Sequence, residues 1–176
     1  MKKMHKNEGF TLIELLIVVA IIGIIAAIAV PGMTRARMSG NEASAIASIR
    51  TIASAEASFA SSCGAGGYAG TMADLADAPT AGGPGFLPGD LAAAIDSSNT
   101  KSGYFFEIED NSSTVVTANP DAICNSATET YSEFIATAAP GAPGTSGTRF
   151  FLTDQSSQIR QGSADLSTIS DGAPLQ

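Results

Sequence analysis

The sequence has little of the chemistry that enzymes use. It contains one histidine, His5, and two cysteines among 176 residues. No imidazole follows His5, so Ser-His and Cys-His nucleophile pairs are excluded from the rest of the chain. The glycine cluster Gly64–Gly70 contains no basic residue, and no glycine loop ends in the Lys-Ser or Lys-Thr of a phosphate-binding loop. The sequence therefore predicts no catalytic residues, no cofactor and no enzymatic activity.

Basic residues are also scarce. The chain carries nine Lys and Arg residues against 17 Asp and Glu residues, a formal net charge of −8. Six of the basic residues and 16 of the acids follow residue 9, which gives that part a net charge of −10. Because an acidic surface repels phosphates, we expect no direct nucleic-acid binding. Arg35, Arg37 and Arg50 are the candidates for a local exception, although such residues more often lie among headgroups or pair with acids.

Two groups of acids are candidates for a calcium site. One is Asp74 with Asp77, and the other combines Glu107, Glu109 and Asp110. Calcium requires several oxygen ligands around one point, and no ligand loop can be assigned to either group. Solvated surface or turn acids are the favoured interpretation, so we expect no metal site.

The longest feature of the chain is an apolar run near its N-terminus. The 21 residues from Phe10 to Val30 would span roughly 31 Å as a helix, about the hydrocarbon thickness of a bilayer. Glu14 is the one charged residue in this run. A carboxylate within a membrane span costs about 2.5 to 3.5 kcal/mol, so it should have a partner. The span contains no positive side chain, but cleavage after Gly9 would create an α-amine at Phe10.

A specific motif surrounds this possible cleavage site. Lys2, Lys3 and Lys6 precede the run Gly9-Phe10-Thr11-Leu12-Ile13-Glu14. This pattern resembles the leader and processing site of type IV pilins and of the pseudopilins of type II secretion. The resemblance implies that a prepilin peptidase and methyltransferase cuts after Gly9 and N-methylates Phe10.

The same resemblance implies how the chain would be used. Glu14 of an incoming subunit would neutralise the Phe10 amine of a neighbour in a helical homo-oligomeric filament. Gly23 and Pro31 match the helix-weakening positions of the family, so a bend or melted turn is expected between them. The chain would lie in membrane lipid before an inner-membrane assembly platform extracts it.

The leader charge sets the expected topology. Lysine-rich flanks remain in the cytoplasm, so the residues after the span should lie outside it. We therefore expect a single-pass protein of the bacterial inner membrane that later becomes a cell-surface or periplasmic filament.

Several alternatives compete with a structural pilus subunit. A secretory signal has a shorter apolar core with its cleavage site after that core, and a plain anchor leaves Glu14 unexplained. A secretion pseudopilin or a minor pilin shares every stem motif. A membrane-tethered binding module would use its head to capture a ligand and would not need Glu14.

Four segments are expected. They are a leader (1–9), a transmembrane half of the stem helix (10–31), an amphipathic half (32–61) and a globular head (62–176). Apolar residues recur at helical spacing in the second half of the stem, namely Ile46, Ile49, Ile52, Ala53 and Phe59. An antiparallel sheet packed on this stripe gives an α+β fold, the architecture that the resemblance also implies.

The head should contain short helices followed by strands. Composition predicts short helices at 72–78 and 90–96 and a turn at 110–113. Three or four antiparallel strands are predicted, at 103–109, 114–118, 131–138 and 149–153. The run 149–154 followed by 158–160 also resembles the closing hairpin of bacterial pilin-like heads. The aromatic residues of the strands should form the head core, and the polar tail 161–176 should lack regular structure.

Cys63 and Cys124 lie on the predicted outer side of the membrane, where a disulfide persists. A bond between them would close a loop of about 60 residues and stabilise the head by about 3 to 4 kcal/mol. The alternative is two separate buried thiols.

Overall fold

A computed structural model describes residues 10–79, 83–109, 114–166 and 172–175. The chain divides into two compact units, Met1–Arg37 and Met38–Gln176, which are treated separately below. The predicted leader and the predicted turn at 110–113 lie outside the described residues.

The longest element is helix α1 (Leu12–Ser62), with 51 residues. It is unbroken through Gly23 and Pro31, so the melted turn expected there is absent from this structure. Proline has no backbone N–H, which leaves the carbonyl of Ala27 without its usual helical donor. The helix ends where predicted, and the amide of Gly64 donates to the Phe59 carbonyl at 2.7 Å.

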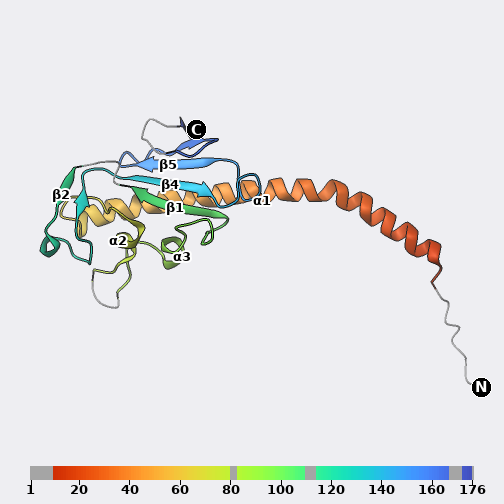
Figure 1. Cartoon of the computed structure of the whole chain (residues 1–176), viewed down its shortest axis with the longest axis horizontal. Coiled ribbons are helices and arrows are strands. Elements are labelled where there is room, and N and C mark those ends of the chain that lie inside the picture. The colour runs from red at the N-terminus through yellow and green to blue at the C-terminus, as the bar shows by residue number, and fades with distance from the viewer. Residues whose placement is uncertain (1–9, 80–82, 110–113, 167–171, 176) are drawn as a thin grey trace, which may run out of the picture. The chain divides into compact units, whose positions relative to one another are not determined.

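The second unit contains a five-stranded antiparallel sheet in the order β1-β4-β5-β6-β7. The strands are β1 (Tyr104–Glu109), β4 (Ile135–Pro140), β5 (Phe150–Asp154), β6 (Arg160–Gly162) and β7 (Ala173–Pro174). In the centre of the register, Phe106 pairs with Ala138, and Ala138 pairs with Phe151. Figure 1 shows these strands lying along the yellow, C-terminal part of α1. The α+β fold is confirmed.

One face of the sheet packs on α1. Ile49, Ile52, Ala53 and Phe59 of the predicted stripe are buried, and Ile46 packs against them. From the sheet, the fully buried side chains are Tyr104, Phe106 and Phe151. Each large apolar side chain buried in this way stabilises the fold by about 1.5 to 3 kcal/mol.

The opposite face of the sheet carries a smaller core. Ile135, Leu152 and Leu166 are buried together there, and Phe150 packs against them. Leu166 belongs to the tail that was expected to lack regular structure. That expectation is wrong for the described residues, because β6 and β7 add to the sheet and the tail covers apolar side chains.

The predicted strand at 131–138 is two strands in different sheets. Strand β3 (Thr130–Tyr131) pairs with β2 (Val115–Thr117) in a two-stranded sheet, and β4 begins at Ile135. Tyr131 bonds the backbone of Tyr68 in both directions, at 2.8 and 2.9 Å. The ring of Phe134 packs 5.0 Å from that of Tyr68. Contacts with this distant residue divide the predicted strand.

Two short helices precede the sheet, α2 (Met72–Ala76) and α3 (Gly89–Ala92). The predicted helix at 90–96 is thus shorter than expected. Its extension is prevented because the Ala94 carbonyl accepts the amide of Phe106 at 2.8 Å. In addition, the Asp96 carboxylate accepts the amides of Ser98 and Asn99.

An ion pair joins α1 to the loop before β5. Arg149 contacts the Glu42 carboxylate at 2.8 Å, and the amide of Thr148 donates to the same carboxylate at 3.0 Å. Burial disfavours the charge on Glu42, but the donors from Thr148 and Arg149 outweigh it and lower the pKa of Glu42. This carboxylate therefore stays ionised and holds the loop on the helix.

Glu56 is the fully buried acid of α1. One carboxylate oxygen accepts the amide of Ala69 at 2.9 Å, and the other has no hydrogen-bond partner among the described residues. The pKa of Glu56 is raised to about 8, mainly by burial. The nearby charge of Asp74 also raises this pKa, whereas the hydrogen bond from the Ala69 amide lowers it. Glu56 is therefore largely protonated at neutral pH.

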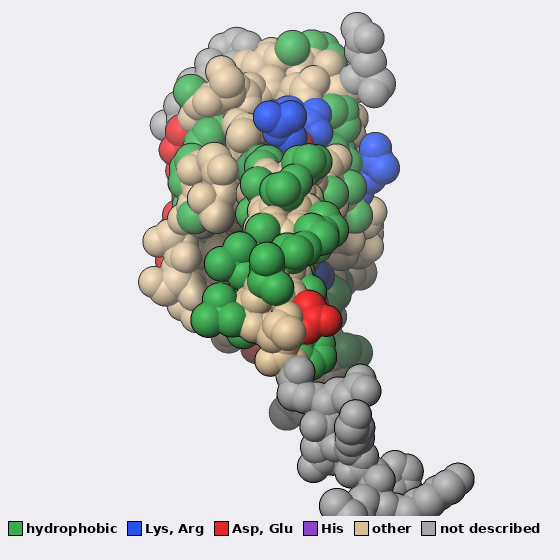
Figure 2. Space-filling view, turned by 90° about the vertical axis from the view of Figure 1, so that its right-hand side faces the viewer, with side chains coloured by type: hydrophobic (Ala, Val, Ile, Leu, Met, Phe, Trp, Pro, Cys, Tyr) green, Lys and Arg blue, Asp and Glu red, His purple; other side chains and the backbone are tan. Residues whose placement is uncertain are grey.

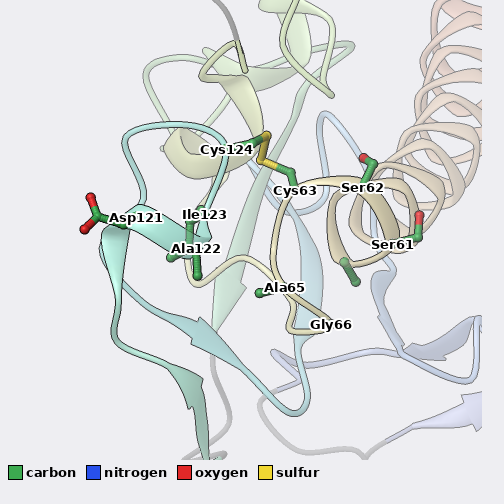
Figure 3. Close-up of a pocket in the computed structure, with 10 residues that line it drawn as sticks. Ser61, Ser62, Cys63, Ala65, Gly66, Asp121, Ala122, Ile123 and Cys124 are labelled. Atoms are coloured by element: carbon green, nitrogen blue, oxygen red, sulfur yellow. A yellow bond between two sulfur atoms is a disulfide. The ribbon is translucent and has the colours of Figure 1, made fainter.

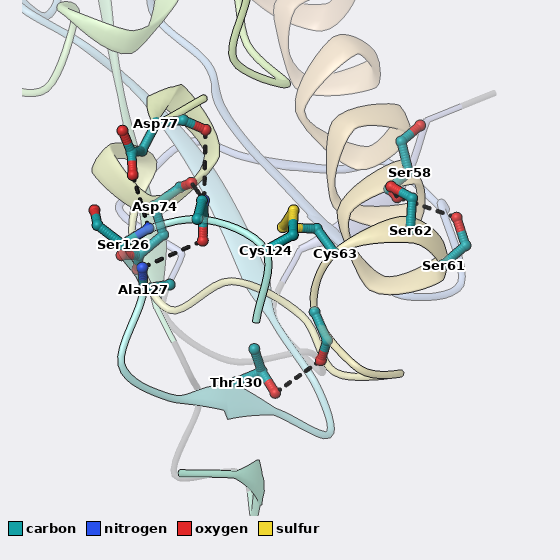
Figure 4. Close-up of a disulfide and its surroundings, with 12 residues drawn as sticks. Ser58, Ser61, Ser62, Cys63, Asp74, Asp77, Cys124, Ser126, Ala127 and Thr130 are labelled. Carbon is teal, nitrogen blue, oxygen red and sulfur yellow. Dashed lines mark hydrogen bonds between the residues drawn. A yellow bond between two sulfur atoms is a disulfide. The ribbon is translucent and has the colours of Figure 1, made fainter. Parts of the chain in front are cut away.

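The predicted disulfide between Cys63 and Cys124 is present. It joins the residue after α1 to a segment that follows the 3-10 helix η1 (Pro120–Ala122), across 61 positions of sequence. Hydrogen bonds reinforce the link on both sides. Thr130 donates to the Gly64 carbonyl at 3.1 Å, and the amide of Ser126 donates to Asp77 at 2.8 Å (Figure 4).

Removing this disulfide should destabilise the head. Cys63→Ala combined with Cys124→Ala is expected to lower the free energy of unfolding by about 3 to 4 kcal/mol, since the unfolded chain regains loop entropy. Chemical denaturation of the full chain in detergent, followed by the near-ultraviolet circular dichroism of its tyrosines, measures this loss. Ser62→Ala is the matched control. An unchanged midpoint in the double variant would show that the bond does not limit stability.

Candidate functional site

The N-terminal part of α1 presents an apolar surface. Its large hydrophobic side chains are more than 45% exposed in the single chain, from Leu12 at 81% to Val18 at 46%. The most apolar 18-residue window of α1 has a mean hydropathy of 3.1 and none of its residues buried, so this one described helix is long and apolar enough to cross a membrane. Figure 2 shows hydrophobic side chains gathered over this surface. Such a surface requires lipid or neighbouring helices.

Glu14 lies in the first turn of α1 and bonds with Thr11. The Glu14 carboxylate accepts from the backbone amide of Thr11 at 3.0 Å and from its hydroxyl at 2.6 Å. The amide of Glu14 donates to the Thr11 hydroxyl at 3.3 Å. These reciprocal bonds form a capping box, which satisfies amides that the start of a helix leaves without partners.

Sequence reasoning missed Thr11 as a partner of Glu14, because it considered only positive charges. The pattern Thr-x-x-Glu immediately before an apolar run is the signature of a capping box and would have identified it. Thr11 provides hydrogen bonds but no charge. The Glu14 carboxylate therefore remains ionisable and available to a cation.

Phe10 directly precedes this box and is 82% exposed. Gly9, the other residue of the predicted cleavage site, lies outside the described residues. Gly23 and Pro31 both lie inside α1, and their helix-weakening role stays a prediction.

The pocket beside the disulfide has no convergent chemical groups. It measures about 440 Å³ and is lined by ten residues. Asp121 is the one charged residue among them, and its carboxylate points away from the sulfur atoms in Figure 3. The remaining lining residues offer serine hydroxyls, backbone groups, small apolar side chains and the disulfide itself, and none of these is a general base.

Asp74 and Asp77, two of the acids considered as calcium ligands, have other partners. Asp74 accepts from the hydroxyl of Thr71 in the cap of α2, and Asp77 accepts from Ser126. Among the described residues, no group of three or more acids, histidines or cysteines could hold a metal ion. Asp110 lies outside those residues.

The three arginines considered for nucleic acid are all on the surface of α1. Arg35, Arg37 and Arg50 form no ion pair with any residue that the structure describes. Arg50 borders a hollow of about 310 Å³ together with Ser157 and Ile159. They do not converge with aromatic side chains, which a single-strand binding groove would need.

Comparison with known proteins identifies the N-terminal segment. Residues 4–30 match the family model described as the prokaryotic N-terminal methylation motif. The chain is similar to the type IV major pilin protein PilA of Myxococcus xanthus, with 45% identity over 51 residues, 29% of this chain and 23% of that protein. It is also 75% identical over 28 residues to the fimbrial protein EcpB of Eikenella corrodens, covering 16% of this chain and 18% of EcpB.

The matched region spans less than a quarter of the length of either relative. The comparison with solved structures finds no match. The matched segment contains the Gly-Phe-Thr-Leu-Ile-Glu run, and the structure adds an apolar helix packed on a small antiparallel sheet. The N-terminal segment therefore carries the prokaryotic N-terminal methylation motif, and with this architecture the chain resembles type IV pilins and pseudopilins.

Proposed function

We propose that the chain is a structural subunit of a type IV pilus-like filament. A peptidase removes residues 1–9 and the new N-terminus at Phe10 is methylated. The subunit waits in the inner membrane as a single-pass protein, and an assembly platform then extracts it into a helical homo-oligomer. The head carries no catalytic activity of its own.

The observation that carries this proposal is an ionisable acid on an otherwise apolar, exposed helix. Glu14 lies in the first turn of α1 within a window of mean hydropathy 3.1, and its bonds to Thr11 are uncharged. A charge in such surroundings is costly unless a cation approaches it. The Phe10 amine of a second subunit provides that cation once the leader is removed.

Assembly would exchange one apolar environment for another. In the membrane the exposed side chains of α1 contact lipid, and in the filament they would contact neighbouring stems. Association between helices in lipid depends on packing and on polar contacts rather than on the hydrophobic effect alone. The pairing of Glu14 with Phe10 would therefore fix the register between subunits.

Terminal mass analysis of sheared cell-surface material tests this function. The expected result is an abundant chain that starts with N-methylated Phe10 and retains the bond between Cys63 and Cys124. A processed chain confined to the membrane fraction would instead support the secretion pseudopilin, and a trace amount in sheared filaments would support a minor pilin. A chain that still begins at Met1 would contradict processing and assembly together.

A further inference from the structure

The edge of the five-stranded sheet is open along part of β1. The backbone of Tyr104 bonds Lys101 in both directions, at 2.8 and 3.1 Å, and the amide of Phe106 donates to Ala94 at 2.8 Å. Beyond Phe106, no described residue forms a backbone hydrogen bond to this edge outside the ladder to β4. Of the last residues of β1, Glu107 and Glu109 have exposed side chains, and Ile108 is buried.

A groove follows this open edge. It measures about 330 Å³ and lies between β1, the start of α2 and the segment after α3. Ile95 is 49% exposed there, although large apolar side chains are usually covered. The groove is lined by Thr71, Met72, Ala73, Ile95 and the residues Phe106 to Glu109.

The groove has a negative rim. Glu107 and Glu109 are exposed, and their carboxylates form no hydrogen bond or ion pair with the residues that the structure describes. Burial raises the pKa of Glu107, and the charges of Glu109 and Asp165 raise it further. These acids repel one another, so a cation placed beside them would be stabilised.

The cations without acid partners in this chain are concentrated on α1. In the head, Lys101 pairs with Asp90 at 3.0 Å and Arg149 pairs with Glu42 at 2.8 Å, whereas Arg160 donates to the Gly172 carbonyl at 3.4 Å and has no described acid partner. Arg35, Arg37 and Arg50 have no such partner among the described residues. Subunits with a net charge of −10 repel each other, so close contact between copies requires that cations meet acids.

Arg37 combines this charge with an apolar neighbour. Met33 precedes it by four residues, so both side chains lie on one face of α1. Met33 is 58% exposed, and Arg37 is exposed as well. A methionine is long and flexible and fits irregular apolar grooves. The methionine on the same face as Arg35 is Met38, three residues after it, which is half-buried, and Arg50 borders residues of its own head.

We propose that the groove along β1 binds the segment Met33–Arg37 of a second copy of this chain. The Met33 side chain lies against the exposed side chains of Ile95 and Ala73, and the Arg37 guanidinium lies beside Glu107 and Glu109. This inference rests on the proposed filament, because the filament brings the stem of one copy to the head of another. It adds a specific contact between stem and head.

Zero-length cross-linking of filaments tests the contact. The Arg37→Lys variant keeps the charge and adds an amine. A carbodiimide activates a glutamate carboxyl group by bonding to it. The lysine amine then attacks the activated carboxyl carbon, an amide bond forms, and the bound reagent leaves as its urea. Lys101 is the one lysine of the chain after residue 9, so its coupling to Asp90 reports that the reagent has reacted. Filaments grown from a mixture of ¹⁴N and ¹⁵N subunits identify bonds between copies.

The expected product joins position 37 of one copy to Glu107 or Glu109 of another. Arg35→Lys is the matched control, and its yield should be about tenfold lower because position 35 lies roughly 200° around the helix from position 37. As an independent test, Arg37→Glu should lower filament yield about tenfold by opposing like charges, and Glu109→Lys in the same chain should restore it.

Filaments that yield the Lys101–Asp90 product but no product from position 37 would overturn the contact and leave the proposed function intact. Equal yields from positions 35 and 37, or coupling of Glu107 and Glu109 to a different protein, would also overturn it. If the unaltered chain forms no filaments, the proposed function is wrong. The proposal that a second copy occupies the groove along β1 is then wrong as well.

Discussion

Replacing Glu14 by alanine should abolish filaments without preventing membrane insertion or cleavage after Gly9. The substitution removes the carboxylate from an apolar span, so insertion becomes easier. It also leaves the Phe10 amine of the neighbouring subunit buried without a counter-ion. Leaving one charge of a buried pair without its partner costs about 3 to 5 kcal/mol, which corresponds to a loss of more than about 100-fold in assembly.

The yield of sheared filaments, set against the amount of processed chain in the membrane, measures this effect. Glu14→Gln separates charge from shape, since it keeps the hydrogen bonds to Thr11 in part but loses the charge. Ile13→Ala is the matched control, because it removes an adjacent apolar side chain and keeps the acid. Abundant filaments from Glu14→Ala would show that the charge does not drive assembly.

Stability of the head should fall as the pH rises, and Glu56 should be the main cause. An ordinary glutamate in the unfolded chain has a pKa near 4.5, whereas burial raises the pKa of Glu56 in the folded chain to about 8. Between these values the folded state binds more protons than the unfolded state, so the free energy of unfolding decreases with pH. The stability is fully present below about pH 4.5 and is lost by about pH 8, a change on the order of 4 kcal/mol.

Glu56→Gln should remove most of this dependence, since an amide fills the same space and does not titrate. Denaturation of the full chain in detergent at pH 5, 7 and 9 gives the slope, and Asp121→Asn is the control at an exposed acid. The variant should be more stable than the unaltered chain at pH 9 and nearly equal to it at pH 5. A Glu56→Gln variant with the original slope would assign the pH dependence to other groups.

The local parts of the fold follow from sequence patterns. The stripe from Ile46 to Phe59 repeats at helical spacing, and its buried face requires a packed sheet. The glycine-rich segment after Cys63 ends α1 because its residues adopt backbone conformations that helices avoid, with Gly66 at a φ of +91°. The strands β1 and β5 were predicted because they combine aromatic residues with bordering turns.

The errors arose where distant residues determine the structure. Tyr68 pairs with Tyr131 and so divides a predicted strand, and no pattern within 131–138 indicates that contact. The helix at α3 stops early because the Ala94 carbonyl bonds Phe106, which belongs to the next strand. Leu166 lies in a polar tail, and the cluster of Ile135 and Leu152 that buries it forms only after the sheet has folded.

The candidate site also has parts that follow from local sequence patterns and a part that depends on distant residues. The positions of Phe10 and Glu14 follow from the sequence because a motif of fixed spacing defines them. The capping bond to Thr11 is also local, and the Thr-x-x-Glu pattern encodes it. The groove beside β1 could not be predicted, because it depends on how α2, Ile95 and β1 meet in space.

In an assembled filament, Glu14 of one subunit is expected to pair with the Phe10 amine of another. Solid-state NMR can measure this directly in filaments grown from two kinds of subunit, one with ¹⁵N-phenylalanine and one with a ¹³C-labelled glutamate carboxyl group. Since no subunit carries both labels, any coupling between them arises from a contact between subunits. The ¹⁵N signal of the terminal amine is resolved from the signals of the backbone amides. We predict a distance of about 4 Å or less between the Phe10 nitrogen and the Glu14 carboxyl carbon, as in a charge-assisted hydrogen bond. Filaments in which this nitrogen shows no coupling to that carbon would show that Glu14 and the Phe10 amine do not pair.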